Sequence, residues 1–246
     1  MKITIYPSGP IQENCLVLVG GSGDTTEGFQ PIVTKISEKL PDYSICTFSF
    51  STHSEAESLL DLQSRELDEV FSEITTKYNF KKIDVFCTSM GAYATIRLLN
   101  NKKYQNLINQ VIMFDPADYY LSAKFANSDD VTWSGPQEYN PIKPVISSEL
   151  STISGNCIVS VVHLTLSNYG VNGYIQKEFK NRGIDDPNGY PRLSTEMVKA
   201  FYAKVPTTNS GKYIEQNLVP HAILRDGNIP ENLDHVVDLI SKLLAK

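Results

Sequence analysis

Short β-prone runs alternate with amphipathic helical segments along most of this chain, and this alternation is what most constrains its fold. A strand, a helix and a second strand in that order build a parallel sheet with helices on its faces. The apolar runs predict strands that are buried on both sides. We expect strands at Lys2–Tyr6 (a short edge strand), Cys15–Val19, Tyr43–Phe50, Lys82–Cys87, Leu107–Phe114, Cys157–Leu164 and Lys212–Asn217. We expect helices at Phe29–Leu40, Glu55–Tyr78, Gly91–Leu99, Ser194–Tyr202 and Glu231–Leu244. The predicted class is therefore α/β, with a mostly parallel central sheet flanked by helices.

The length of 246 residues allows one large domain or two small ones, and 41% hydrophobic residues suffice for a substantial core. We predict a single domain over residues 1–246. One stretch, about 116–155, is rich in Tyr, Trp, Ser, Pro and Asn and has weak periodicity. It is too long for an ordinary connection, so we expect a small lid-like cap insertion at one end of the sheet.

The charge balance and the cysteines restrict compartment and partners. A net charge of −6 without a long basic run argues against nucleic acid as the main partner and gives no attraction to anionic membranes. The sequence has no run of 18 apolar residues, so we expect no membrane-spanning helix. The first residues lack the apolar core of a signal peptide. The four cysteines have no CxxC spacing, which favours small buried side chains over a zinc or disulfide set. We expect a cytoplasmic protein without metal or organic cofactor, and the oligomeric state stays open.

The segment Ile83–Leu99 carries the most specific chemical signal. A strand runs through Thr-Ser89-Met-Gly91 directly into a helix, and a serine on so sharp a turn presents its hydroxyl at the helix N-terminus. Ser89 is the only serine of the chain with a glycine two residues further on. Against the usual G-x-S-x-G pattern, Cys87 replaces the first glycine. We predict that Ser89 is a nucleophile, the alternative being a serine that caps the helix.

At this point the chain resembles the α/β-hydrolase superfamily of esterase- and lipase-like serine hydrolases over nearly its whole length. The segment Leu16–Pro31, with Gly20-Gly21-Ser22-Gly23, is similar to that family's strand, oxyanion turn and helix, and Gly20 stands where many members carry His. The resemblance implies that the backbone N–H groups of Ser22 and Met90 form an oxyanion hole. The alternatives for this turn are a flexible loop or a phosphate-binding loop, and no Gly-Lys-Ser/Thr follows to support the latter.

Four histidines could serve as the base that activates Ser89. His221 lies in a loop after the last expected strand and before the last helix, which resembles the family's placement of the catalytic histidine. His53, in a Ser-rich loop, comes next. His163 lies within a strand and is expected to be a hydrogen-bonded core residue, while His235 is expected to face solvent or the sheet from the last helix. An imidazole with a pKa of about 6.5 can take and return a proton near neutral pH.

The third member of a catalytic triad would be an acid that orients the histidine. The family usually places its acid just after the strand that corresponds to Cys157–Leu164, but no carboxylate follows there. Asp115-Pro116-Ala117 is similar to the acid of pancreatic-type lipases, which follows the strand after the nucleophile helix. Asp115 is therefore favoured as the acid of the triad. The alternatives that stay open are Asp118, Asn168, Asp185 and Asp186.

The resemblance implies a serine hydrolase that cleaves an ester or thioester of a small to medium acyl group through an acyl-enzyme. Its partner would be a small-molecule acyl ester. Aromatic residues of the expected lid could line the acyl pocket: Tyr119, Tyr120, Phe125, Trp133 and Tyr139. The alternatives are a non-catalytic binding protein on the same fold and an acyltransferase that uses the same serine.

Overall fold

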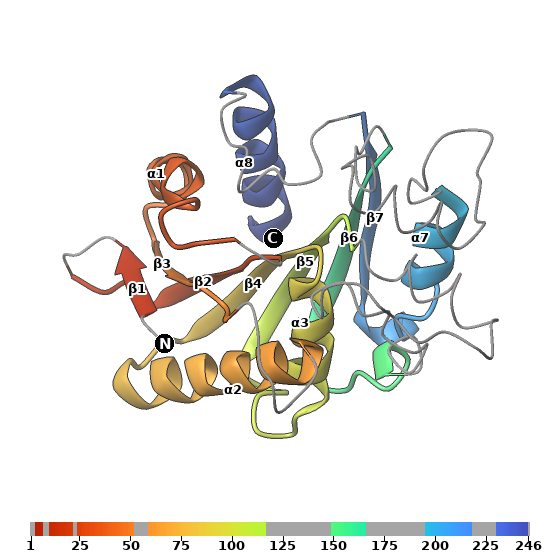
Figure 1. Cartoon of the computed structure of the whole chain (residues 1–246), viewed down its shortest axis with the longest axis horizontal. Helices are drawn as coiled ribbons and strands as arrows, with labels where there is room; N and C mark the ends of the chain where they lie inside the picture. Colours follow the sequence, from red (N-terminus) through yellow and green to blue (C-terminus); the bar gives the residue numbers. More distant parts are fainter. Residues whose placement is uncertain are drawn as a thin grey trace.

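One mixed, mostly parallel sheet organises the molecule (Figure 1). The computed structural model describes residues 3–6, 10–21, 24–51, 59–116, 149–165, 195–217 and 230–245. In this part of the chain the sheet has seven strands in the order β1-β3-β2-β4-β5-β6-β7. The strands are β1 (Ile3–Tyr6), β2 (Asn14–Val19), β3 (Tyr43–Phe48), β4 (Lys82–Thr88), β5 (Ile108–Phe114), β6 (Ile158–Leu164) and β7 (Ser210–Gln216). Only β1, at the edge, pairs antiparallel with its neighbour β3. The predicted fold class is confirmed.

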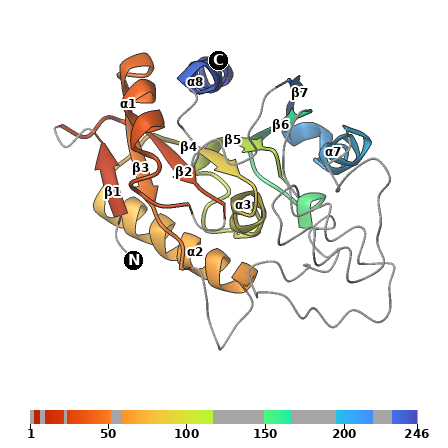
Figure 2. The same ribbon diagram turned by 45° about the horizontal axis from the view of Figure 1, so that its top comes forward.

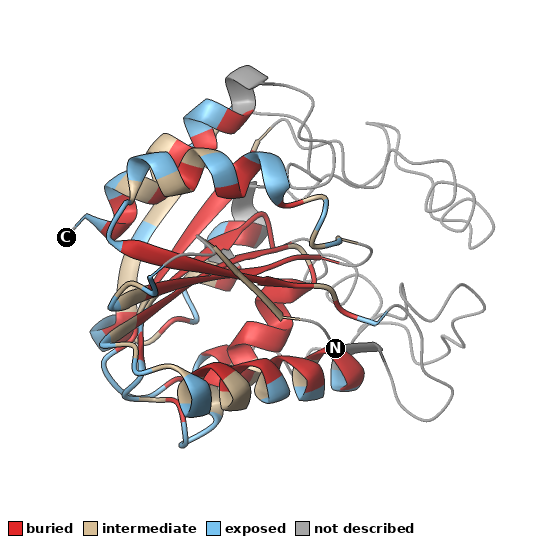
Figure 3. Ribbon diagram, turned by 90° about the vertical axis from the view of Figure 1, so that its left-hand side faces the viewer, coloured by how far each residue is buried: buried red, intermediate tan, exposed pale blue. Residues whose placement is uncertain are grey.

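The helices form two layers around the sheet (Figure 2). They are α1 (Gln30–Lys39), α2 (Leu59–Lys77), α3 (Gly91–Asn100), α7 (Thr195–Tyr202) and α8 (Pro230–Leu244). Helices α1 and α8 cover one face, and α2, α3 and α7 cover the other. Side chains alternate accordingly along β4, where Val85 and Cys87 join the core under α2 and α3, and Phe86 joins the core under α1 and α8. Figure 3 shows the resulting sheet, buried on both faces between the two layers.

The predicted elements agree with the structure except at their ends. The expected strand Tyr43–Phe50 stops at Phe48, because Ser49 turns away and its hydroxyl accepts the Thr26 N–H at 2.8 Å. The expected strand Lys212–Asn217 begins earlier, at Ser210, directly after a short 3₁₀ turn at Thr207–Asn209. Both differences arise from local hydrogen bonding that apolar periodicity does not report.

The topology gathers the carboxyl ends of six parallel strands at one edge of the sheet. Strand β3 lies on one side of β2, and β4 lies on its other side. The direction in which the chain adds strands to the sheet therefore reverses between β2 and β4. In open α/β sheets, ligands bind outside the carboxyl ends of the strands at such a reversal. Two predicted site segments follow these strands, the glycine turn after β2 and Ser89 after β4.

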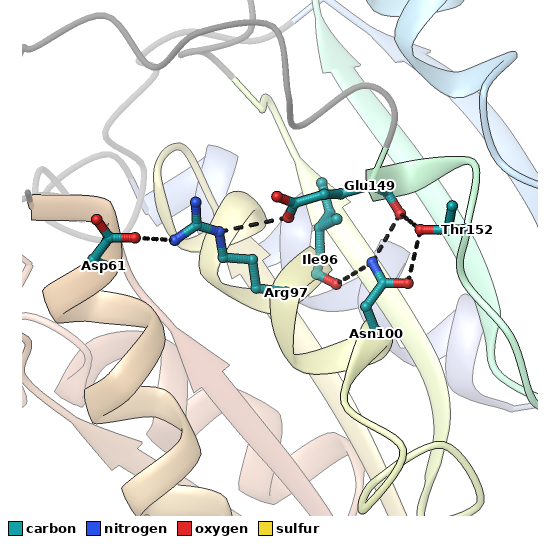
Figure 4. A network of polar contacts seen from close by, with 6 residues as sticks. All are labelled: Asp61, Ile96, Arg97, Asn100, Glu149 and Thr152. Carbon is teal, nitrogen blue, oxygen red and sulfur yellow. Dashed lines mark hydrogen bonds and ion pairs between the residues drawn. The ribbon is translucent and has the colours of Figure 1, made fainter.

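Most of the predicted lid, residues 117–148, lies outside the described residues. The chain is described again from Glu149 onward, and there a network of polar contacts connects it to α3 (Figure 4). The Arg97 guanidinium pairs with Asp61 of α2 and, at 3.5 Å, with the Glu149 carboxylate. The Asn100 amide donates to the Glu149 carbonyl at 2.8 Å, and the Thr152 hydroxyl donates to Asn100 Oδ1 at 3.1 Å. The residues just before β6 are therefore fixed to the same layer as the helix that begins after Ser89.

Among the described residues, no helix is both long and apolar enough to cross a lipid bilayer.

Candidate active site

Ser89 and Met90 alone make the turn between β4, which ends at Thr88, and α3, which begins at Gly91. Ser89 has φ 49°, a left-handed conformation that is uncommon for residues other than glycine. Its N–H donates to the Phe114 carbonyl of β5 at 3.2 Å. The first residue outside α3 is Met90, without a side-chain cap, so the alternative of Ser89 as a helix cap is wrong. A strained turn holds this serine at the carboxyl edge of the sheet.

Close backbone contacts around the turn require glycine. A Cβ on Gly91 would lie 2.4 Å from the Gly20 carbonyl oxygen and 2.8 Å from that of Val19. A Cβ on Gly21 would lie 2.8 Å from the Ser89 Cβ and 3.3 Å from its hydroxyl oxygen. The glycine turn after β2 therefore packs directly against Ser89 and against the start of α3.

The predicted oxyanion donors are described in part. Met90 is 4% exposed, and its side chain packs on Leu62 of α2. No acceptor for the Met90 N–H is found in the described part of the chain. Ser22 lies outside the described residues, whereas Gly21 before it and Asp24 after it are described.

Asp24, which no motif in the sequence marks, closes the glycine turn. Its carboxylate oxygen Oδ2 accepts the Gly21 N–H at 2.6 Å, and its own N–H donates to the Gly21 carbonyl at 3.4 Å. The side chain and the backbone of Asp24 thus hold the same glycine that touches Ser89. Aspartate is a frequent turn residue because its side chain bonds nearby backbone N–H groups, and this signal could have drawn attention to Asp24.

Asp115 follows β5 at the same edge of the sheet. It has φ 46°, and within the described residues it shares a positive φ only with Ser89 among residues other than glycine. Thr88 pairs with Phe114 in the sheet register, so the serine and the aspartate directly follow paired residues of neighbouring strands. Asp115 is 0% exposed, and its N–H donates to the Val162 carbonyl at 2.8 Å. Aspartate tolerates a positive φ better than serine does, and left-handed residues other than glycine cluster at functional sites.

The other predicted bases and acids are only partly described. His221 and His53 lie outside the described residues, and so do Asp118, Asn168, Asp185 and Asp186. The chain is described again up to Asn217, at the carboxyl end of β7, four residues before His221. The carboxyl end of β7, which precedes His221 in the sequence, therefore lies at the edge of the sheet that carries Ser89 and Asp115.

The two described histidines differ in their surroundings. His235 on α8 is exposed and its Nε2 lies 2.5 Å from Gln216 Oε1, in agreement with the expectation that it faces solvent or the sheet. His163 on β6 is 1% exposed, as expected for a core residue. Its Nδ1 makes no hydrogen bond in the described structure, so the expectation of a hydrogen-bonded core histidine is wrong for this atom. Asp115 Oδ1 lies 3.4 Å from it.

All four cysteines are free and buried, as expected from their spacing and apolar surroundings in the sequence. Burial raises the pKa of Cys46, Cys87 and Cys157 to about 12, and it also raises the pKa of Cys15. Cys87 replaces the first glycine of the G-x-S-x-G pattern and is 0% exposed, so it acts there as a packed side chain and not as a second nucleophile.

A thiol titration tests this burial. With a pKa of about 12, roughly one thiol in ten thousand is ionised at pH 8, so the native protein should react with a disulfide reagent far more slowly than free cysteine does. In denaturant we expect rapid release of four equivalents, one for each cysteine. Fast reaction of even one thiol in the native protein would contradict the described packing.

Within the described residues, no group of three or more His, Cys, Asp or Glu side chains is placed to hold a metal ion.

Comparison with solved structures finds the same fold in two esterases and a lipase. An esterase from Pyrococcus furiosus superposes with a TM-score of 0.60 at 15% identity, over 95% of this chain and 83% of that one. The chain has the α/β-hydrolase fold. Est1E from Butyrivibrio proteoclasticus, solved with ferulic acid, matches this fold with a TM-score of 0.60 at 13% identity, over 99% and 96% of the two chains. A monoacylglycerol lipase from Paleococcus ferrophilus gives 0.59 at 13% identity, over 99% and 100%.

By sequence, no family model and no curated protein matches the chain. In the α/β-hydrolase fold, chemistry is determined by the residues at the carboxyl edge and not by the fold itself.

Proposed function

We propose that this protein is a serine hydrolase that cleaves carboxylic esters or thioesters of small to medium acyl groups. The observation that carries the proposal is a pair of left-handed residues, Ser89 and Asp115, with φ of 49° and 46° on adjacent strand ends. Backbone conformations of this kind cluster at active sites and ligand clamps. The α/β-hydrolase fold of esterases and a lipase supports the same class of reaction.

In the proposed mechanism, Ser89 Oγ attacks the acyl carbonyl carbon while His221 takes the hydroxyl proton. Asp115 orients the imidazole and stabilises the imidazolium that forms. The backbone N–H groups of Ser22 and Met90 bind the oxyanion of the tetrahedral intermediate, which collapses when His221 returns the proton to the leaving alcohol or thiol. Water, deprotonated by His221, then cleaves the acyl-enzyme and releases the acid and free Ser89.

An ester assay tests the proposal. We expect the purified protein to hydrolyse p-nitrophenyl esters from acetate to octanoate and a matching acyl thioester, with a maximum at one chain length. Absence of turnover on all of them, together with no labelling by a fluorophosphonate, would favour the non-catalytic binding protein. If added alcohol or thiol acceptors yield new esters in preference to free acid, the protein is an acyltransferase.

Asp24 offers a further test through the oxyanion turn. We expect Asp24→Ala to lower kcat about 10- to 100-fold, because the Gly21 N–H loses its 2.6 Å acceptor and the turn becomes less rigid. The effect should be smaller than that of removing an oxyanion donor itself, which lowers kcat by about 10²–10³. Asp24→Asn keeps an acceptor oxygen and should remain within about tenfold of the wild type. An Asn variant as impaired as the Ala variant would mean that the charge of Asp24 acts, and not its hydrogen bond to Gly21.

A further inference from the structure

Gln63 is a buried polar side chain of α2 that the proposed mechanism does not use. It is 1% exposed, and its amide oxygen Oε1 has no hydrogen-bond partner in the part of the chain that the structure describes. An amide oxygen has two lone pairs and can only accept hydrogen bonds. Buried polar atoms are nearly always paired, so an unpaired acceptor in this position calls for an explanation.

The position of Gln63 along α2 lies beyond the strand ends. Strands β3 and β4 are both parallel to β2, so α2, which connects them, begins at the carboxyl edge of the sheet and returns to the amino edge. The Glu66 carboxylate accepts the Ser51 N–H at 2.9 Å, and Ser51 already lies past the end of β3 at Phe48. Gln63 precedes Glu66 by almost one turn, about 4.5 Å further out along the helix. Ligands of open α/β sheets bind in this layer.

The Gln63 side chain lies on the face of α2 that is turned to the sheet. Leu67, Val70 and Ile74 follow it at helical spacing, and all three belong to the core under α2 and α3. Gln63 continues this face one turn closer to the carboxyl edge. Its buried amide therefore lies between the start of α2 and the strand ends, and not in solvent.

The start of α2 also lies against the turn that carries Ser89. Leu62 contacts Met90, the residue after Ser89, and both side chains are buried. Among the described buried side chains, these two form a cluster of their own, separate from the two core clusters. On the same turn of α2, Asp61 pairs with Arg97 of α3 (Figure 4). An apolar pair and an unpaired acceptor thus lie next to the nucleophile, as in small-molecule sites, which have apolar walls and few polar groups.

We propose that Gln63 is a specificity-determining residue, whose Oε1 accepts a hydrogen bond from a hydroxyl group that the substrate carries close to its ester bond. This inference rests on the proposed function and names its substrate class, hydroxylated esters. A substrate without the hydroxyl leaves the buried oxygen unpaired in the complex, and a site with a buried hydrogen-bonding group rejects such an analogue strongly. The hydroxyl belongs to the acyl chain or to the alcohol, and paired substrates distinguish the two.

Two pairs of esters, in which a methyl group replaces the hydroxyl, test this recognition. Ethyl 3-hydroxybutanoate and ethyl 3-methylbutanoate test the acyl chain, and 2-hydroxyethyl butanoate and propyl butanoate test the alcohol. With pH-stat titration of the wild type, we expect kcat/KM to favour the hydroxylated ester about 10- to 100-fold in one pair. That pair identifies the part of the substrate that carries the hydroxyl. Equal kcat/KM within both pairs, or a preference for the methyl esters, would overturn the inference.

Variants of Gln63 link the preference to its oxygen. Gln63→Met keeps the length of the side chain but removes the acceptor, so the ratio within the preferred pair should fall to about one. The variant should melt at least as high as the wild type, because a buried unpaired oxygen is gone. Leu67→Met, one turn further along the same face, controls for repacking of α2 and should keep the wild-type ratio. A wild-type ratio in Gln63→Met would contradict the role of Gln63.

The failures of this inference and of the proposed function are distinguishable. If Gln63→Met does not fold, Gln63→Leu removes the same oxygen and decides in the same way. If the wild type hydrolyses esters through Ser89 without regard to the hydroxyl, only this inference falls. If the wild type hydrolyses no ester, the proposed function falls with it.

Discussion

Ser89→Ala should lower kcat for p-nitrophenyl ester hydrolysis by about 10⁴- to 10⁶-fold, the loss seen when a serine nucleophile is removed. The hydroxyl is the only atom lost, and the turn is held by backbone bonds that alanine also makes, such as the one from its N–H to Phe114. KM and the melting temperature should therefore change little. Ser241→Ala on α8 is a matched control, because that hydroxyl only donates to the carbonyl of its own helix at Val237, and it should retain wild-type activity.

Ser89→Gly extends this test to the strain at the turn. Glycine adopts a φ of 49° without steric cost, whereas serine and alanine do not. We expect Ser89→Gly to be as inactive as Ser89→Ala but more stable than it by about 1 kcal/mol in urea unfolding. A glycine variant no more stable than the alanine variant would show that the turn carries no strain, and would remove the main support for a functional serine.

Asp115→Asn should lower kcat by about 10⁴-fold, as expected when the acid of a serine triad loses its charge and the histidine its correct tautomer. Asparagine has the same shape, tolerates a positive φ, and can still accept the Leu164 N–H, so the sheet should be unchanged. Steady-state kinetics on the ester that the wild type prefers, together with circular dichroism, measure both effects.

The competing acids provide the controls for Asp115. Asp118→Asn, Asp185→Asn and Asp186→Asn should each remain within about threefold of wild-type kcat, because none of these residues belongs to the proposed triad. A loss of about 10⁴-fold in one of these three, with Asp115→Asn near the wild type, would move the acid to that residue. It would also leave the strained backbone of Asp115 without a catalytic role.

Local pattern was sufficient to predict most of the fold. The buried strands are apolar and short, the helices have one apolar face, and Ser89 lies on a turn that its neighbours in sequence determine. The resemblance that pointed to Asp115 was equally local, an aspartate and a proline at a strand end. The ends of the strands at Phe48 and Ser210 depend on side-chain and turn hydrogen bonds, which periodicity does not contain.

The closeness of His163 to Asp115 could not be predicted in this way. The two residues are 48 positions apart, and only the register of β5 against β6 brings Val162, His163 and Leu164 to the aspartate. A one-residue shift of that register would turn the His163 ring to the other face of the sheet. Asp24 was missed for a simpler reason, since a turn aspartate gains meaning only when its glycine is seen to touch Ser89.

Mass spectrometry of the protein after reaction with a fluorophosphonate tests the central claim most directly. We predict one phosphonyl group per chain, on the peptide that contains Ser89, and none in Ser89→Ala. A phosphonyl group on another residue, or an unmodified Ser89 in protein that turns over ester, would contradict the account.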